Sequence, residues 1–158
     1  MEEQRPHKKI FTPHQVKLKA EAYCAYQERS QQEVRDKLYE WGLHLENVEQ
    51  IISELIATNF LNEERFANAF VLGKFRIKGW GKIKIQQHLK AKRVSPPLIK
   101  AALQQIDLDD YEQKLTTIIE KKINGDVQQL TIQDKAKLIR YLQSKGYENA
   151  LIFEKIRV

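Results

Sequence analysis

The side chains of this chain that could take part in binding chemistry are mostly basic, and they are concentrated in one stretch. Between Arg65 and Ile106 there are ten Lys and Arg residues and no Asp or Glu. The residues before this stretch hold 8 basic and 12 acidic side chains, and the residues after it hold 9 of each. The formal net charge of +6 therefore comes from the middle of the chain. A concentrated positive field attracts a polyanion, which is a nucleic acid or an acidic protein surface.

We predict that this basic window, residues 65–106, forms the partner-binding or DNA-binding surface. The candidate contact residues are Arg65, Lys74, Arg76, Lys78, Lys82, Lys84, Lys90, Lys92 and Arg93. At about 100° per residue, a helix beginning near Lys82 carries one polar stripe, formed by Lys82, Gln86, Lys90 and Arg93. A solvated helix face is the alternative interpretation, but such a face normally mixes both signs of charge. Charge alone does not distinguish phosphates from an acidic protein surface.

The other reactive residue types form no catalytic or metal-binding constellation. The four histidines are far apart in the sequence and have no metal-ligand spacing with Cys24. Gly79-Trp80-Gly81-Lys82 lacks the spacing and the hydroxyl residue of a phosphate-binding loop. Cys24 falls on the apolar stripe of its predicted helix, which favours a small core residue over a nucleophile. We therefore predict a protein that is not an enzyme, with no catalytic residues, no metal site and no cofactor.

Composition limits the compartment and the class of protein. The single cysteine excludes an internal disulfide and suits a reducing compartment. No apolar run approaches the ~20 residues that a membrane-spanning helix needs. The first residues are polar and lack the apolar core of a signal peptide. We expect a soluble, cytoplasmic monomer.

Helices are the elements that must position the basic window. Thr12-Pro13 is typical of a helix start, and Ser30 and Glu33 have the spacing of a capping box. Asn62, Ser95-Pro96, either Asp109 or Asp110, and Thr131 mark further starts. Apolar residues recur at helical spacing between these caps, and no stretch has the alternation of a strand. The sequence predicts an all-α fold.

The chain also contains a weak internal repeat. Leu38, Leu89 and Leu142 are equivalent, each with an aliphatic residue four positions earlier and an apolar residue five positions later. Such a period is typical of stacked supersecondary units. Chance matching is the alternative, and the aligned glycines Gly42 and Gly146 count against it. We predict an elongated array of three tandem three-helix, helix-turn-helix-like units.

The predicted units are residues 12–77 with a leading helix, 78–125, which carries much of the basic charge, and 126–158. Residues 1–11 form a basic N-terminal arm, and the sequence leaves open whether it is ordered. Trp80 lies between two glycines, and it either contacts a partner or covers the junction between the first two units. We favour the junction, because burying a large ring is strongly stabilising. Ile83 projects away from the apolar stripe of its helix and is expected to be exposed.

Three segments resemble the RecX family. They are residues 30–38 (SQQEVRDKL) with Trp41-Gly42, residues 60–67 (FLNEERFA), and residues 79–85 (GWGKIKI) with Leu89 and residues 92–95 (KRVS). The sequence departs from the family pattern at Lys82, Ile83 and Arg93, where a proline, an arginine and a glycine are usual. The resemblance implies three tandem three-helix units and a regulator that binds the RecA recombinase filament on DNA. Such proteins suppress RecA strand exchange, ATP hydrolysis and co-protease action.

Two other functions stay open on the residues themselves. One is a stand-alone DNA-binding protein built from helix-turn-helix-like units, which would bind single- or double-stranded DNA through the basic surface without RecA. The other is a scaffold that binds only acidic protein partners and has no affinity for DNA. Salt-dependent DNA binding in the absence of RecA distinguishes these two.

Overall fold

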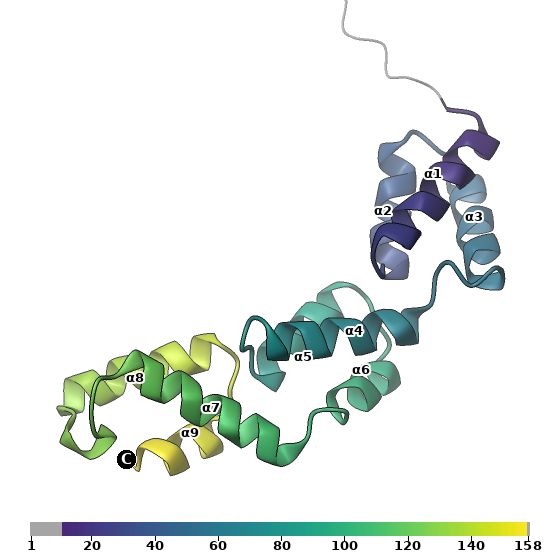
Figure 1. The fold of residues 1–158 in the computed structure, drawn as a ribbon. Coiled ribbons are helices and arrows are strands. Elements are labelled where there is room, and N and C mark those ends of the chain that lie inside the picture. The colour runs from purple at the N-terminus through teal and green to yellow at the C-terminus, as the bar shows by residue number, and fades with distance from the viewer. Residues whose placement is uncertain (1–10, 158) are drawn as a thin grey trace, which may run out of the picture. The chain divides into compact units, whose positions relative to one another are not determined.

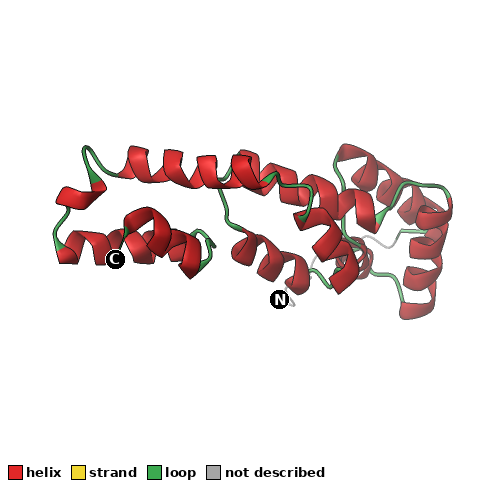
Figure 2. Ribbon diagram, turned by 90° about the horizontal axis from the view of Figure 1, so that it is seen from below, coloured by secondary structure: helices red, strands yellow, loops and turns green. Residues whose placement is uncertain are grey.

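The computed structural model describes residues 11–157, and every regular element in this range is helical (Figures 1 and 2). The elements in chain order are α1 (Pro13–Tyr26), α2 (Gln31–Glu40), α3 (Leu45–Ala57), α4 (Glu63–Arg76), α5 (Lys82–Ala91), α6 (Pro96–Leu103), α7 (Leu108–Lys122), the short 3₁₀ helix η1 (Val127–Gln129), α8 (Ile132–Ser144) and α9 (Asn149–Ile156). The predicted all-α class is confirmed. The arm residues Arg5, Lys8 and Lys9 lie outside the described range. None of the described helices is long and apolar enough to cross a membrane.

Side-chain caps at the predicted positions begin several of these helices. Thr12 and Ser30 each form a complete capping box, with Gln15 and Glu33 as the reciprocal partners. The Asn62 side chain accepts a hydrogen bond from the backbone N–H of Arg65 over 2.9 Å. Each cap satisfies a backbone donor that has no partner within its own helix, which fixes where the helix begins.

The predicted cap of α7 is wrong by two or three residues. Asp107 is the N-cap, and its carboxylate accepts hydrogen bonds from the backbone N–H groups of Asp109 and Asp110. The two predicted caps therefore lie in the first turn, where their negative charges complement the helix dipole. Three aspartates lie within four positions here, and their spacing alone does not show which of them is the N-cap.

The ends of α2, α5 and α8 repeat one geometry. The residue four positions after each repeat leucine has a positive φ: Gly42 (91°), Arg93 (58°) and Gly146 (98°). In all three, the next residue donates its backbone N–H to the carbonyl oxygen of the leucine, over 3.1–3.2 Å. This left-handed cap turns the chain toward the following helix. Arg93, which stands where the RecX pattern usually has glycine, takes the same conformation despite its side chain.

The chain divides into two compact units, and the division falls within α4: unit 1 ends at Phe66 and unit 2 begins at Ala67. In unit 1, α1, α2 and α3 pack around one apolar core (Figure 1). Val34, Leu38 and Leu55 are fully buried there, and Cys24 lies at its edge with 6% of its surface exposed. Truncating such a buried leucine to alanine typically costs about 2–5 kcal/mol.

Unit 2 contains two groups of helices that are joined by backbone hydrogen bonds. The Gly81 N–H donates to the carbonyl oxygen of Lys145 over 2.7 Å, and the Ile83 N–H donates to that of Gly146 over 3.0 Å. The Tyr111 hydroxyl accepts a hydrogen bond from the Lys82 N–H over 3.0 Å and donates one to Glu148 over 2.8 Å. The start of α5 is therefore held by the turn after α8.

Candidate functional site

Four of the basic residues of unit 1 have carboxylate partners, whereas Lys19 and Arg29 lie over aromatic rings. Lys17 pairs with Glu54 over 3.2 Å and Lys37 with Glu40 over 3.3 Å. Two further pairs, Arg35–Glu49 and Arg65–Glu28, complete the set of four described in this unit. Exposed pairs of this kind contribute little to stability, but they neutralise the surface charge of unit 1.

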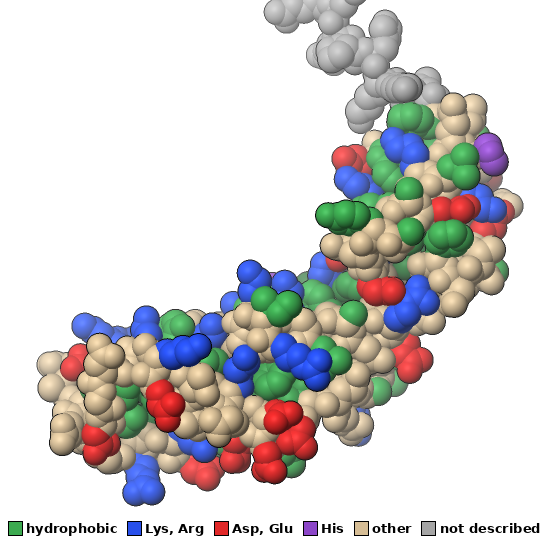
Figure 3. Space-filling model, in the orientation of Figure 1, with side chains coloured by type: hydrophobic (Ala, Val, Ile, Leu, Met, Phe, Trp, Pro, Cys, Tyr) green, Lys and Arg blue, Asp and Glu red, His purple; other side chains and the backbone are tan. Residues whose placement is uncertain are grey.

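Three of the basic residues at the start of unit 2 have no such partner in the described part of the chain. Among the described residues, no carboxylate lies within 4.0 Å of the ammonium groups of Lys74, Lys82 or Lys84. Each of the three ammonium groups lies over an aromatic ring instead. Figure 3 shows blue Lys and Arg side chains on the visible face of unit 2, together with red Asp and Glu side chains. The positive charge is therefore available to an external anion.

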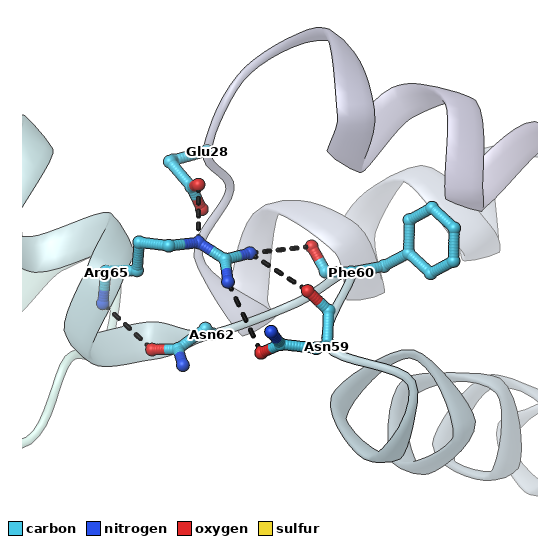
Figure 4. Close-up of polar contacts among 5 residues, drawn as sticks. All are labelled: Glu28, Asn59, Phe60, Asn62 and Arg65. Carbon is cyan, nitrogen blue, oxygen red and sulfur yellow. Dashed lines mark hydrogen bonds and ion pairs between the residues drawn. The ribbon is translucent and has the colours of Figure 1, made fainter.

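Arg65 differs from the rest of the window because it is engaged within unit 1 (Figure 4). Its guanidinium donates to the Glu28 carboxylate, to the Asn59 side chain over 3.3 Å, and to the backbone carbonyl oxygens of Asn59 and Phe60 over 3.1 and 3.3 Å. These contacts fix the turn between α3 and α4 to the chain after α1. We therefore assign Arg65 a structural role and leave it out of the binding surface.

One face of α5 borders a groove. Lys82, Gln86 and Lys90 lie on this face, so the predicted stripe forms at these three positions. The groove has a volume of about 470 Å³, and Lys100 of α6 adds a further positive charge. Its apolar floor comes from Pro96, Ile99 and Leu103. Arg93 is exposed just beyond α5 but does not line the groove.

The opposite side of α5 faces an aromatic cluster that the sequence did not indicate. The Trp80 ring lies 4.6 Å from the His88 ring and 6.5 Å from the Phe70 ring, between centroids. The ammonium groups of Lys84 and Lys74 lie 4.5 and 4.9 Å from the Trp80 centroid. We call these five residues the Trp80 cluster. Lys84 and His88 are one helical turn apart in α5, and the packing of α4 against the Gly79–Gly81 turn adds the other members.

The electrostatic environment of His88 follows from this cluster. Partial burial lowers the pKa of His88 below its ordinary value of 6.5, and the nearby charges of Lys84, Lys74 and Lys92 lower it further. The lowered pKa favours the neutral form of His88, and its ring packs against the Trp80 indole at an interplanar angle of 50°. An anion bound to these lysines would raise the pKa of His88 again, because it would offset their positive charges.

The remaining candidates at the end of α4 are exposed. The Arg76 and Lys78 side chains both point to solvent. Their backbone carbonyl oxygens accept hydrogen bonds from the ammonium groups of Lys114 and Lys145, over 3.0 and 3.2 Å. Lys92 lies 5.9 Å from the Phe70 ring centroid, next to the Trp80 cluster. The predicted exposure of Ile83 is confirmed, with 40% of its surface accessible.

The structure offers no support for Cys24 as a nucleophile or for a metal site among the described residues. Burial raises the pKa of the Cys24 thiol to about 11, so the thiol is not a nucleophile at neutral pH. The described residues include no group of three or more His, Cys, Asp or Glu side chains that could hold a metal ion. The chemistry of this surface is that of cations and aromatic rings.

Three family models match consecutive parts of the chain. They describe the first, second and third three-helix domains of RecX and cover residues 17–55, 62–103 and 109–156. The chain belongs to the RecX family. The matched ranges group the helices as α1–α3, α4–α6 and α7–α9, which confirms the three tandem three-helix units. The boundaries that we predict at residues 77 and 125 stay predictions.

Individual relatives are proteins named Regulatory protein RecX. The one from Clostridium perfringens strain 13 is 33% identical over 76% of this chain and 57% of its own length. The one from Streptococcus gordonii is 26% identical over 79% of this chain and 48% of its own length. The chain thus spans about half the length of the curated relatives it matches.

Solved RecX structures have the same fold. The crystal structure of RecX from Lactobacillus salivarius superposes with a TM-score of 0.79, covering 92% of this chain and 94% of the other, at 24% identity. A second RecX structure superposes with a TM-score of 0.71, over 92% of this chain and 73% of the other. Within the second RecX domain, the Trp80 ring contacts Phe70 of α4 edge-on and His88 of α5.

Proposed function

We propose that this protein binds the RecA recombinase filament on DNA and inhibits its recombinase, ATPase and co-protease activities, acting by binding and not by catalysis. The observation that carries the proposal is the series of three RecX domains, of which the second contains most of the basic window, residues 65–106, a stretch without Asp or Glu. The family resemblance supplies RecA as the partner. The charge supplies the attraction to a nucleoprotein filament, whose DNA is a polyanion.

Within this proposal, the middle RecX domain makes the electrostatic contacts. Lys82, Lys90 and Lys100 border the groove between α5 and α6, and Lys74 and Lys84 lie on the other side of α5. Such contacts attract phosphates irrespective of base sequence, as a regulator of a filament on arbitrary DNA requires. We propose a cytoplasmic monomer as the acting form.

A triple charge reversal tests this assignment. Lys82→Glu, Lys90→Glu and Arg93→Glu together should leave the helical circular dichroism unchanged and abolish inhibition of RecA ATP hydrolysis on single-stranded DNA. The matched control is Lys121→Glu, Lys137→Glu and Arg140→Glu, three exposed positions in the third domain with the same change of net charge. Inhibition should survive in the control. Full inhibition by the first variant would refute the role of this surface.

A stand-alone DNA-binding protein is the second candidate, favoured by the same lysines. If about five of them contact duplex phosphates, log K should fall with log salt at a slope near roughly −4.5. Tight binding without RecA, together with a preference for particular sequences, would support this candidate over the first. An absence of DNA affinity even at low salt would instead indicate a scaffold for acidic proteins.

A further inference from the structure

The Trp80 cluster combines two features that a phosphate-binding surface alone does not need. The first is the Trp80 indole, which packs against the His88 ring with centroids 4.6 Å apart and ring planes tilted by 50°. The second is a pair of ammonium groups, on Lys74 and Lys84, that lie over the Trp80 ring. The two lysines come from different helices, α4 and α5, so the ring is flanked by cations from two sides of the turn.

The ammonium groups are held weakly in this position. A cation over a partly exposed ring gains far less than a charge-assisted hydrogen bond to a phosphate oxygen. Neither lysine has a carboxylate within 4.0 Å in the described part of the chain. A phosphate can therefore draw both ammonium groups away from the ring at small cost, and their departure exposes its face.

We propose that the Trp80 cluster binds single-stranded nucleic acid, with a base stacked on the Trp80 ring and the flanking phosphates bound by Lys74 and Lys84. This proposal rests on the DNA contact in the proposed function and specifies the strand form that it recognises. Single strands present free base faces, whereas a duplex buries them between neighbouring base pairs. An acidic protein surface would use the two charges but would gain little from the ring.

The two tryptophans of the chain make the proposal directly measurable. Trp41 lies in unit 1 and Trp80 in unit 2, so the variant Trp41→Phe leaves Trp80 as the sole indole. Oligothymidylate should quench the fluorescence of this variant, because the base stacks on the ring. An abasic oligonucleotide of equal length should bind through its phosphates without quenching. The reciprocal variant, Trp80→Phe, should show no quenching of Trp41.

Affinities provide the second readout. Trp80→Leu should weaken binding of oligothymidylate by roughly 5- to 150-fold and leave the affinity for the abasic strand unchanged. Trp80→Tyr should restore most of the affinity, because it restores an aromatic face. Lys74→Gln combined with Lys84→Gln should weaken the binding of both strands. It should also reduce the slope of log K against log salt by roughly 1–2. A thermal melt of each variant separates loss of folding from loss of binding.

Three outcomes would overturn the proposal: an affinity of Trp80→Leu for oligothymidylate equal to that of the unsubstituted protein, quenching by the abasic strand, or no quenching by either strand. A change in Trp80 fluorescence on adding RecA without DNA would assign the cluster to a protein surface instead. The RecA ATPase assay is independent of these measurements. If Trp80→Leu inhibits RecA fully but binds single strands normally, the cluster proposal fails and the proposed function stands.

Discussion

The contact between Gly81 and Gly146 yields a prediction whose sign and size follow from the structure. Gly81 has φ −79° and ψ 167°, an extended conformation that alanine adopts without strain. A Cβ at this position would nevertheless lie 2.4 Å from the carbonyl carbon and oxygen of Gly146 and 2.5 Å from the Tyr147 nitrogen. All three are backbone atoms, so no side-chain rotation relieves the clash. Gly81→Ala must separate the start of α5 from the turn after α8.

The cost of this separation has identifiable parts. Two backbone hydrogen bonds, from Gly81 to Lys145 and from Ile83 to Gly146, lengthen or break, at about 0.5–1.5 kcal/mol each. Overpacking adds about 1–3 kcal/mol, and the smaller entropy of the unfolded alanine chain returns about 0.4–1 kcal/mol. We expect a net loss of about 3 kcal/mol. For a unit of this size, that lowers the melting temperature by roughly 12–24 °C.

Urea unfolding in the Trp41→Phe background measures this loss, because Trp80 then reports on unit 2 alone. Gly73→Ala is the matched control. Gly73 lies inside α4, and a Cβ there would meet no atom within 4 Å, so alanine should stabilise the helix by up to about 1 kcal/mol. The two glycine-to-alanine changes are thus expected to act in opposite directions. A neutral or stabilising effect of Gly81→Ala would contradict the close approach of the two turns.

Three further predictions concern single side chains. Arg93→Gly should raise stability by about 1 kcal/mol in urea unfolding, because glycine removes the cost of the left-handed conformation at φ 58°; an unchanged midpoint would refute this. His88 should titrate below 6.5 in NMR, because burial and the neighbouring lysines oppose its protonation, and its pKa should rise when oligothymidylate binds. Since the unfolded chain takes up that proton first, the contribution of His88 to stability is present above pH 6.5 and is lost as the pH falls. The Cys24 thiol, with its pKa raised from 9.0 to about 11, should react with iodoacetamide at pH 8 at least roughly a hundredfold more slowly in the native state than in urea. Comparable rates in both states would show that Cys24 is exposed.

The local features of the fold were predictable because their causes lie within a few residues. Ser30 and Glu33 form the capping box that their spacing predicted. The repeat built on Leu38, Leu89 and Leu142 reappears as one geometry at three helix ends. Where several residues could serve the same local purpose, as at Asp107, Asp109 and Asp110, the sequence did not select among them.

The candidate site was predictable only as a stretch of chain. Net charge is a property of composition, so the excess between Arg65 and Ile106 is visible without a structure. The sequence does not show which of these basic side chains pair with a carboxylate in the folded protein. Arg65 is engaged by Glu28, 37 residues earlier, and this contact forms only when the end of α1 meets the start of α4. Nothing in the sequence distinguishes Arg65 from the other basic residues of the window in this respect.

The motifs of the sequence indicated the family by resemblance. The sequence by itself also determined the helices, most of their caps, the threefold repeat and the region of positive charge. Each of these follows from backbone hydrogen bonding, side-chain periodicity or composition, which act over short distances along the chain. The tertiary structure decided which cations are neutralised, which lie over Trp80, and that Gly81 must remain glycine. Those outcomes depend on burying apolar faces from distant helices against one another, and that packing alone brings the side chains of α4, α5 and the turn after α8 together.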